Sequence, residues 1–420
     1  MALHARGAAG RSPLHATKLA LVALLAITGV LAFTTGNAHA ASPGRGGFVP
    51  IKPFRLVDTR GANGVPYGTP PFAGGETRTF NAYAANNGQV PSGAVGSLAL
   101  NVTAVGPPGA GYLTVWPTGD PMPTASVLNY TPGSIVPNAV TVKVAAAGTF
   151  NVFAQTATSV VVDVMGYYAN TGGTPDGGGF QGIAPKRLMD TRVPLGASRF
   201  ASGGVATLSV VGSGAAPSGA AAVVLNVTVT APAGPGFLTA WPAGVARPVV
   251  SNLNYTSGQT RANQVTVKVG AGGAVSLFAQ TAADVVVDIM GWYAGGAPTA
   301  GGFVPLDPVR IMDTRILFGD VNYDPVTDSM ILHVGGANGV PVNAGAVSLN
   351  VTGVLPQREG YLTVFPDGTS LPLSSNLNFA TDDIVPNAVT VGLGAKFGVE
   401  LYSPAFLDVL ADIGGYFTPA

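Results

Sequence analysis

The chain has 420 residues; 47% are hydrophobic, only 10% are charged, and there are 59 glycines, 34 prolines and no cysteine. This hydrophobic content excludes a disordered protein, and the lack of cysteine excludes disulfides and zinc sites of the usual Cys/His kind. The 20 basic and 20 acidic side chains balance, so no excess of positive charge favours binding to nucleic acid or anionic lipid.

The first 40 residues have the pattern of a secretion signal. Three basic side chains accompany an apolar run over residues 19–33, and the small-x-small sequence Ala38-His39-Ala40 follows. The run is too short to favour a permanent membrane anchor. We therefore predict a signal peptide over residues 1–40 and an exported mature protein that does not insert into the membrane and is secreted, extracellular or associated with the cell wall.

Four sequence landmarks follow, and each occurs three times in the same order at a spacing of about 125 residues. They are RLxDTR at residues 55–60, 187–192 and 310–315; LNVT at 100–103, 225–228 and 349–352; GYLTVWP and its variants at 111–117, 236–242 and 360–366; and VVVDVMGYY and its variants at 160–168, 285–293 and 409–417. The repetition predicts three copies of one domain, over residues 41–168, 180–293 and 302–420.

Within the first copy, short β-branched runs alternate with Gly- and Pro-rich turns, and no apolar period of helical length occurs. This pattern predicts eight strands, over residues 48–60, 77–84, 97–105, 112–116, 126–130, 139–144, 149–154 and 159–164. Alternation around LNVT predicts one buried face for that strand. Eight antiparallel strands in about 120 residues are typical of a two-sheet sandwich, either jelly-roll or Ig-like.

The copies are joined by Gly-rich segments at residues 169–179 and 294–302. Such segments usually act as flexible tethers, so the sequence favours three tandem all-β sandwich domains. A closed pseudo-threefold disc is an alternative that nothing in the sequence demands.

A carboxylate lies inside the valine-rich last strand of each copy, where it is costly unless it is paired. We predict that Asp163 pairs with Arg60 or Arg55 of the first strand. The corresponding predictions pair Asp288 with Arg192 and Asp412 with Arg315. The alternative is a carboxylate that points to solvent at the strand end.

Aromatic residues suggest a binding surface. Strand alternation places Tyr112 and Trp116 on one face, and the pattern recurs in the other copies with Phe237, Trp241, Tyr361 and Phe365. Exposed aromatic rings can stack on sugar rings, and three copies would add avidity. The alternative is that this face belongs to the core.

The third copy contains an acidic insertion, FGDVNYDPVTDSM. Asp320, Asn322, Asp324 and Asp328 occupy positions 1, 3, 5 and 9 of a calcium loop, but the Gly and Glu expected at positions 6 and 12 are replaced by Pro and Ile. A complete EF-hand is therefore excluded. The remaining alternatives are a partial calcium site and a solvated acidic loop, and no other cofactor is predicted.

Catalytic groups are scarce. His333 is the single histidine after the leader, and no G-x-S-x-G sequence accompanies it. Asp58 with Asp163, and their repeats, could form a glycosidase-like pair of carboxylates, but each lies beside an arginine or among valines, which favours a structural role. We predict that the protein is not an enzyme.

Asparagines also recur, at Asn101, Asn129 and Asn138 and their counterparts. We predict that they bond backbone groups at strand ends and turns. The N-x-T sequons at Asn101, Asn226 and Asn350 lie within predicted strands, so they are interpreted as strand residues rather than glycan acceptors.

The motifs RLxDTR, LNVT, GYLTVxP, SNLN, ANxVTV and VVVDVxGYY, taken together, resemble a β-rich repeat of exported actinobacterial proteins. The resemblance covers most of residues 47–418, although VLADIGGYF and the acidic insertion of the third copy depart from it. It implies an extracellular, non-enzymatic module and no particular ligand.

The sequence thus favours a secreted protein with a structural or adhesive role at the cell envelope. The alternative is a carbohydrate-binding protein that acts through the three aromatic stripes. The expected partners are cell-wall or environmental polysaccharide, or another envelope protein.

Overall fold

The computed structural model describes residues 46–61, 65–84, 88–170, 178–212, 215–296, 300–324 and 326–419. The predicted signal peptide lies outside these ranges. The described residues are almost entirely strands and turns, with one short 3₁₀ turn, η3 (Ala271–Gly273). Within the described ranges we find no helix with the length and apolar character needed to cross a membrane.

The first copy folds into two antiparallel sheets, and all eight predicted strands are present. The inner sheet, in the order β1-β8-β3-β6, consists of β1 (Phe48–Asp58), β3 (Val95–Val105), β6 (Ile135–Lys143) and β8 (Ser159–Ala169). The outer sheet, in the order β2-β7-β4-β5, consists of β2 (Glu76–Asn81), β4 (Gly111–Pro117), β5 (Leu128–Tyr130) and β7 (Thr149–Ala154).

The other two copies repeat this topology. In the second, the inner strands are β9 (Phe180–Asp190), β11 (Ala220–Thr230), β14 (Arg261–Lys268) and β16 (Asp284–Ala294), and the outer strands are β10 (Gly204–Ser209), β12 (Gly236–Pro242), β13 (Leu253–Tyr255) and β15 (Ala274–Ala279). In the third, the inner strands are β17 (Phe303–Asp313), β20 (Ala346–Val354), β23 (Ile384–Gly392) and β25 (Asp408–Phe417). Its outer sheet contains β18 (Val321–Asp324), β19 (Ser329–His333), β21 (Gly360–Pro366), β22 (Leu377–Phe379) and β24 (Gly398–Tyr402), so the acidic insertion adds an edge strand, β18.

The central strands of the inner sheets are buried on both faces. In β3, Leu98 and Leu100 face a core shared with the outer sheet of the same copy. Ala99 and Asn101 point to the opposite face, yet only 7% and 2% of their surfaces are exposed. The prediction of one buried face was therefore wrong, because the second face packs against the neighbouring copies.

Asparagines at the centre of the molecule join the copies to one another. We call the set the asparagine ring; its members are Asn101, Asn226 and Asn350 from the LNVT strands and Asn138, Asn263 and Asn387 from β6, β14 and β23. At the first junction, Asn263 Nδ2 donates to Asn101 Oδ1 at 2.9 Å, and Asn101 Nδ2 donates to the Ser251 carbonyl at 2.7 Å. Asn263 Oδ1 in turn accepts from the Ala139 amide at 3.2 Å. These amides bond backbone within their own copy, as Asn263 does at the Asn252 carbonyl, and also bond backbone and one another across copies.

The same contacts recur around the ring. Asn387 of the third copy donates to Asn226 of the second at 3.0 Å. Asn138 of the first copy donates to Asn350 of the third at 2.7 Å, which returns the ring to its start. Because buried amides are costly unless bonded, the three copies depend on one another for polar partners.

A fourth hydrophobic core, which we call the central aromatic core, is built from residues of all three copies. Its aromatic members are Phe48, Tyr168, Phe180, Tyr293, Phe303 and Phe417. The Tyr168 and Tyr293 hydroxyls are 2.7 Å apart within it. Gly166 of the MGYY segment allows Phe48 to enter, since a Cβ there would lie 2.5 Å from the Phe48 ring.

The linkers take part in this closure. The Phe48 amide donates to the Gly178 carbonyl at 2.9 Å, and the Phe303 amide donates to the Gly46 carbonyl at 2.9 Å. A Cβ on Gly178 would lie 1.5 Å from the Ala294 carbonyl oxygen, so the close backbone approach requires glycine. The described ends of the linkers are bonded to neighbouring copies rather than serving as free tethers.

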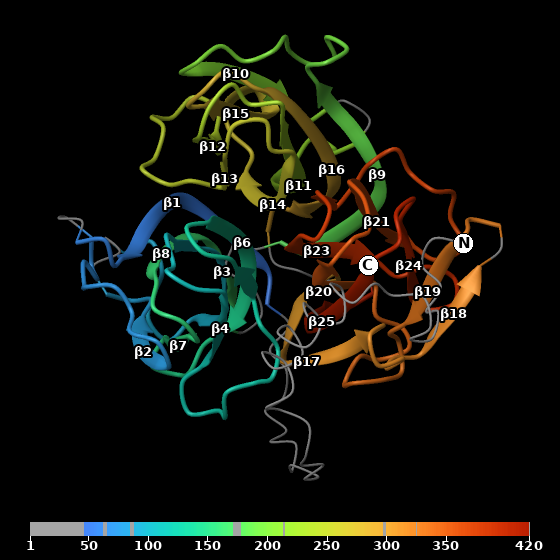
Figure 1. Cartoon of the computed structure of the whole chain (residues 1–420), viewed down its shortest axis with the longest axis horizontal. Coiled ribbons are helices and arrows are strands. Elements are labelled where there is room, and N and C mark those ends of the chain that lie inside the picture. The colour runs from blue at the N-terminus through green and yellow to red at the C-terminus, as the bar shows by residue number, and fades with distance from the viewer. Residues whose placement is uncertain are drawn as a thin grey trace.

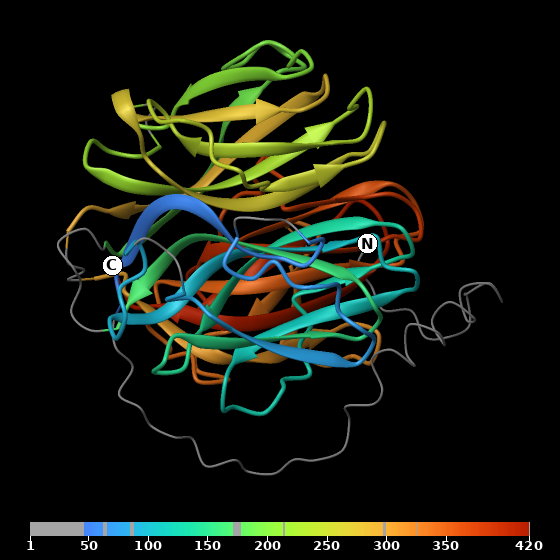
Figure 2. The same ribbon diagram turned by 90° about the vertical axis from the view of Figure 1, so that its left-hand side faces the viewer.

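The expectation of three tandem jelly-roll or Ig-like sandwich domains is therefore wrong, although the all-β content is confirmed. The six small sheets form one closed arrangement, in which three lobes of two sheets each, one lobe from each copy, surround a common centre (Figure 1). In the perpendicular view the strands run mainly along the short axis of the molecule (Figure 2). The central aromatic core and the asparagine ring join the three copies, and tandem domains on flexible tethers would lack both.

Candidate ligand-binding surface

Each RLxDTR segment takes part in a row of four alternating charges. In the first copy, Arg55 donates to both oxygens of Asp163 at 2.8 and 3.1 Å and to Asp58 at 3.2 Å. Arg60 donates to both oxygens of Asp58 at 2.8 and 2.6 Å. Burial opposes the charge of Arg55, but the bonds and charge of Asp163 raise the Arg55 pKa above its usual value. Burial likewise opposes ionisation of Asp58, but Arg60 brings the Asp58 pKa below its usual value.

Asp163 pairs with Arg55, one of its two predicted partners, but the partners predicted for the other two last-strand carboxylates are wrong. Asp288 is bound by Arg187 at 2.9 Å and not by Arg192. Asp412 is bound by Arg310 at 2.8 Å and not by Arg315. The reason is register, because in each copy the first arginine of RLxDTR lies directly opposite the carboxylate in the neighbouring strand.

The second arginine of each motif follows the strand end and folds back onto the motif's own aspartate. Arg192 binds Asp190 at 2.8 Å, and Arg315 binds Asp313 at 2.9 Å. Arg60 therefore binds Asp58 rather than Asp163. In each copy the first arginine, which is partly buried, ties the first strand to the last, and the second arginine closes the motif's own turn. The second arginine is exposed in the first two copies but only 12% exposed in the third.

The carboxylates Asp58 and Asp163 are buried and share one arginine. Asp58 and Asp163 expose only 1% and 0% of their surfaces, and Arg55 bonds to both. A glycosidase pair must flank the sugar and, in the inverting case, an attacking water, so a guanidinium in this position favours a structural role.

The predicted aromatic stripes are only partly exposed. Trp116, Trp241 and Phe365 expose 5%, 5% and 0% of their surfaces, so they are not available to stack on a ligand. The Trp116 Nε1 donates to the Asp120 carbonyl at 3.1 Å, and the Trp241 Nε1 donates to the Val245 carbonyl at 3.0 Å. These tryptophans hold the loop that follows their strand, and that loop covers them.

Three equivalent pairs of aromatic rings, each at least partly exposed, lie instead on the solvent-facing side of the outer sheets. We call them the aromatic pairs; they are Tyr112–Phe153, Phe237–Phe278 and Tyr361–Tyr402, with ring centroids 5.9, 5.7 and 6.3 Å apart and planes tilted by 45–50°. Tyr361 is exposed and the other five rings are half-buried. The predicted set supplied one member of each pair, and the second member comes from β7, β15 and β24.

Register explains how each pair forms. In the first copy, Thr114 lies opposite Phe153, so Tyr112, two residues earlier on the same face, is the diagonal neighbour of Phe153. Burial raises the pKa of Tyr112, and burial together with Tyr402 raises the pKa of Tyr361. Both hydroxyls therefore stay protonated at neutral pH and can donate hydrogen bonds. A tilted pair of this kind can contact the C–H face of a sugar ring.

A loop lies beside each aromatic pair and is fixed by the outer sheet. We call these segments the covering loops; they span residues 118–127, 243–252 and 367–376. A threonine on the same face as the pair holds each loop: Thr114 donates to the Ala125 carbonyl at 3.3 Å, and Thr239 donates to the Val250 carbonyl at 2.7 Å. Thr363 makes the equivalent bond in the third copy. The surroundings of the three pairs are therefore built alike.

The acidic insertion forms a hairpin of β18 and β19 rather than a calcium loop. Asn322 bonds to the His333 ring at 2.8 Å, Asp324 accepts from the Val326 amide at 2.8 Å, and Asp328 accepts from the Tyr323 hydroxyl at 2.6 Å. The Asp320 carbonyl accepts from the His333 amide. Because a hairpin spreads these side chains along two strands, they do not converge, and the described residues contain no group of three or more His, Cys, Asp or Glu side chains that could hold a metal ion. These contacts favour the alternative of a solvated acidic loop over a partial calcium site.

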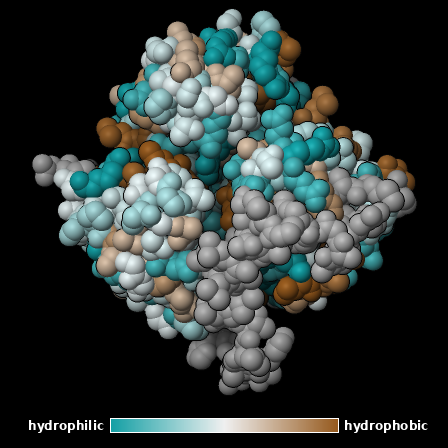
Figure 3. Space-filling model, viewed as in Figure 1, coloured by the Kyte–Doolittle hydropathy of each residue, from teal (hydrophilic) through white to brown (hydrophobic). Residues whose placement is uncertain are grey.

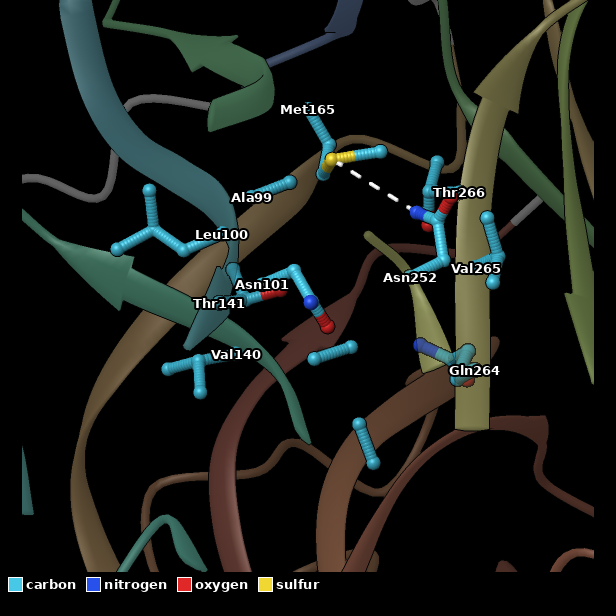
Figure 4. Close-up of a pocket in the computed structure, with 12 residues that line it drawn as sticks. Ala99, Leu100, Asn101, Val140, Thr141, Met165, Asn252, Gln264, Val265 and Thr266 are labelled. Carbon is cyan, nitrogen blue, oxygen red and sulfur yellow. Dashed lines mark hydrogen bonds between the residues drawn. The ribbon is translucent and has the colours of Figure 1, made fainter. Parts of the chain in front are cut away.

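Residues of all three copies meet at the centre of the molecule. A cavity there has a volume of about 20 Å³, enough for roughly one water, and its lining includes Asn101, Thr141, Met165, Asn252 and Gln264 (Figure 4). A second hollow of about 200 Å³ lies between the second and third copies. In the view of Figure 3, hydrophobic patches are small and separated by hydrophilic residues. The repeated feature most suited to contact a ligand is the set of aromatic pairs.

Neither a family model nor a curated protein matches the chain. Among solved structures, the N-terminal CBM22-1–CBM22-2 tandem domain of Paenibacillus barcinonensis Xyn10C is 11% identical, with 57% of this chain and 100% of that chain covered and a TM-score of 0.18. A triple jelly-roll protein of an archaeal virus turret is 8% identical, with 88% and 91% covered and a TM-score of 0.17. At these TM-scores neither likeness bears on the fold or the ligand of this chain.

Proposed function

We propose that the protein is an exported, non-catalytic adhesive protein that binds polysaccharide of the cell wall or the environment through its aromatic pairs. The observation that supports this proposal is the recurrence of the same partly exposed pair on three outer sheets. A polysaccharide presents the same sugar many times, so one chain of it can engage more than one pair. Linked weak contacts of this kind raise overall avidity by about 10²–10⁴ when geometry allows simultaneous binding.

Rigid presentation adds to this effect. The asparagine ring and the central aromatic core fix the three copies relative to one another, so no linker entropy is lost when a second pair binds. The carboxylates that could have served catalysis are buried and bound to arginine. These features favour holding a polymer over cleaving it.

The proposal is tested with the predicted mature chain, residues 41–420, on columns of cellulose, chitin, xylan and purified cell wall. Phe153→Ala, Phe278→Ala and Tyr402→Ala each remove one pair. We expect each single change to weaken retention, and the triple variant to lose it by about a hundredfold, the lower end of the avidity range. Phe318→Ala is the matched control, since Phe318 is a 47% exposed aromatic residue outside the pairs.

Circular dichroism and thermal melting establish that each variant remains folded. Retention of the triple variant at the wild-type level would rule out the aromatic pairs as the binding surface. Retention on the wall column alone, removed by protease treatment of that wall, would instead identify an envelope protein as the partner.

A further inference from the structure

We infer that the aromatic pair of the second copy binds an acidic sugar, and that Arg247 selects it. The inference rests on the proposed function and assigns a ligand class to one of its three sites. The Arg247 guanidinium carbon lies 3.6 Å from the centroid of Phe278, whose ring is in turn 5.7 Å from that of Phe237. The second copy therefore presents a positive charge directly on its aromatic pair.

The position of Arg247 is fixed by its loop. The Trp241 indole holds the loop at the Val245 carbonyl, two residues before Arg247, and Thr239 holds it at the Val250 carbonyl, three residues after. The cation–π contact adds about 0.5–1 kcal/mol at an exposed site. Arg247 thus has a defined location, although its side chain is exposed.

The guanidinium of Arg247 has no hydrogen bond or ion pair with any residue that the structure describes. Its face contacts Phe278, so the N–H groups on its edges remain available. A planar fork of donors matches the two oxygens of a carboxylate or the oxygens of a phosphate, and forms shorter and stronger bonds with them than with a neutral hydroxyl. The ring–guanidinium surface can therefore contact a sugar ring and its acidic substituent together.

The other two copies lack this charge. Alignment on the loop prolines, which are Pro123, Pro248 and Pro372, places Met122 and Leu371 at the position of Arg247. Their side chains are also exposed, by 46% and 37%. The three sites thus share an aromatic pair but differ in charge at this loop position, so the first and third copies favour uncharged sugars and the second favours acidic ones.

The test compares ligands that differ only in charge. Binding of residues 41–420 to polygalacturonate is measured by affinity electrophoresis and calorimetry at low salt, beside the methyl-esterified polymer, which is neutral. Polyglycerol phosphate distinguishes a phosphate source from a carboxylate source. We expect the wild type to prefer the acid form over the ester by about tenfold, the value of a single charge-assisted bond in a partly exposed site. The preference should fall as salt is added.

Arg247→Met, which copies the first repeat, should remove the preference and leave binding to the neutral ester intact. Met122→Arg should increase the preference. Lys268→Met is the control, because it removes one exposed charge from the same copy away from the pair. An unchanged preference in Arg247→Met, or an equal loss in Lys268→Met, would overturn the inference.

The two proposals fail in different ways. If the triple aromatic variant binds the neutral ester as the wild type does, the proposed function fails. If the aromatic pairs are required but esterification changes nothing, only the role of Arg247 fails.

Discussion

Replacing one amide of the asparagine ring should destabilise the whole molecule. In Asn263→Ala, three hydrogen bonds disappear: those with Asn101 Oδ1, the Asn252 carbonyl and the Ala139 amide. Asn263 is 1% exposed, so water does not readily replace these partners. Each buried polar group that loses its hydrogen-bond partner lowers the free energy of unfolding by about 1–3 kcal/mol. Three such groups, each taken in the lower half of that range, lower it by roughly 4 kcal/mol. This is a large part of the 5–15 kcal/mol by which folded proteins are usually stable.

The assay is urea unfolding of residues 41–420 at neutral pH, followed by tryptophan fluorescence and by circular dichroism. Because the ring connects all three copies, we expect one transition for both probes, with a lower midpoint in the variant. Asn254→Ala is the matched control, since Asn254 lies outside the ring, is half-buried and accepts one bond from the Ser251 hydroxyl at 3.2 Å. The control should lose about 0.5–1.5 kcal/mol, the value of one bond. A loss in Asn263→Ala no greater than in the control, or separate transitions for the copies in the wild type, would refute the reasoning.

Three further predictions concern the charged rows and the packing of glycine. Arg187→Met leaves Asp288 buried and unpaired, so the free energy of unfolding should fall by about 3–5 kcal/mol in the same urea assay, and a loss under 1 kcal/mol would contradict the buried pair. Arg192→Gln should raise the pKa of Asp190, which is lowered mainly by the Arg192 hydrogen bond, and carboxyl NMR titration measures this directly. The pKa of Asp190 is lower in the folded state than in the unfolded state, so the contact stabilises the fold fully above the unfolded pKa near 3.8 and loses this effect as pH falls through the folded pKa. The difference in stability between the variant and the wild type should therefore shrink in that acid range. A difference that stays constant with pH would argue against ionisation of Asp190 as its origin. Gly291→Ala should lower the melting temperature by several degrees, since its Cβ would lie 2.5 Å from the ring of Phe180; an unchanged temperature would show that the central aromatic core relaxes freely.

Local patterns in the sequence were sufficient to predict the strands, because alternation and turn residues act within a few positions. They were insufficient to predict the arrangement of the sheets. The second face of β3 carries a small residue, Ala99, and a polar one, Asn101. This pattern is compatible with a face exposed to solvent and equally with a polar interface. The face is in fact buried by the second copy, whose Asn263 and Ser251 bond Asn101 and lie more than a hundred residues away in the sequence. Periodicity carries no information about such a partner.

In the candidate site, too, the residues on one strand could be predicted from the sequence but their partners on other strands could not. Tyr112 was predicted as a ligand contact from its own strand, but its partner Phe153 lies on β7, and only the register of β4 against β7 brings the two together. A signal was present, because an aromatic residue recurs at the same place in NVFAQ, SLFAQ and ELYSP. Trp116 was misassigned because its exposure depends on the course of the covering loop, which strand alternation does not determine.

The bond between Asn138 and Asn350 also constrains how the protein is made. The two residues are 212 positions apart, so at 5–20 residues per second a ribosome synthesises the second partner about 10–40 s after the first. Until the third copy is present, the first copy lacks its partner for Asn138 and the second copy lacks its partner for Asn226. These two free faces are complementary to each other, because the copies share one fold and repeat the same contacts. A chain truncated after the second copy would keep both faces permanently and associate head to tail with its own kind, as heterologous contacts that do not close generate open assemblies. The third copy is thus the one that joins the faces of the first two and closes the arrangement.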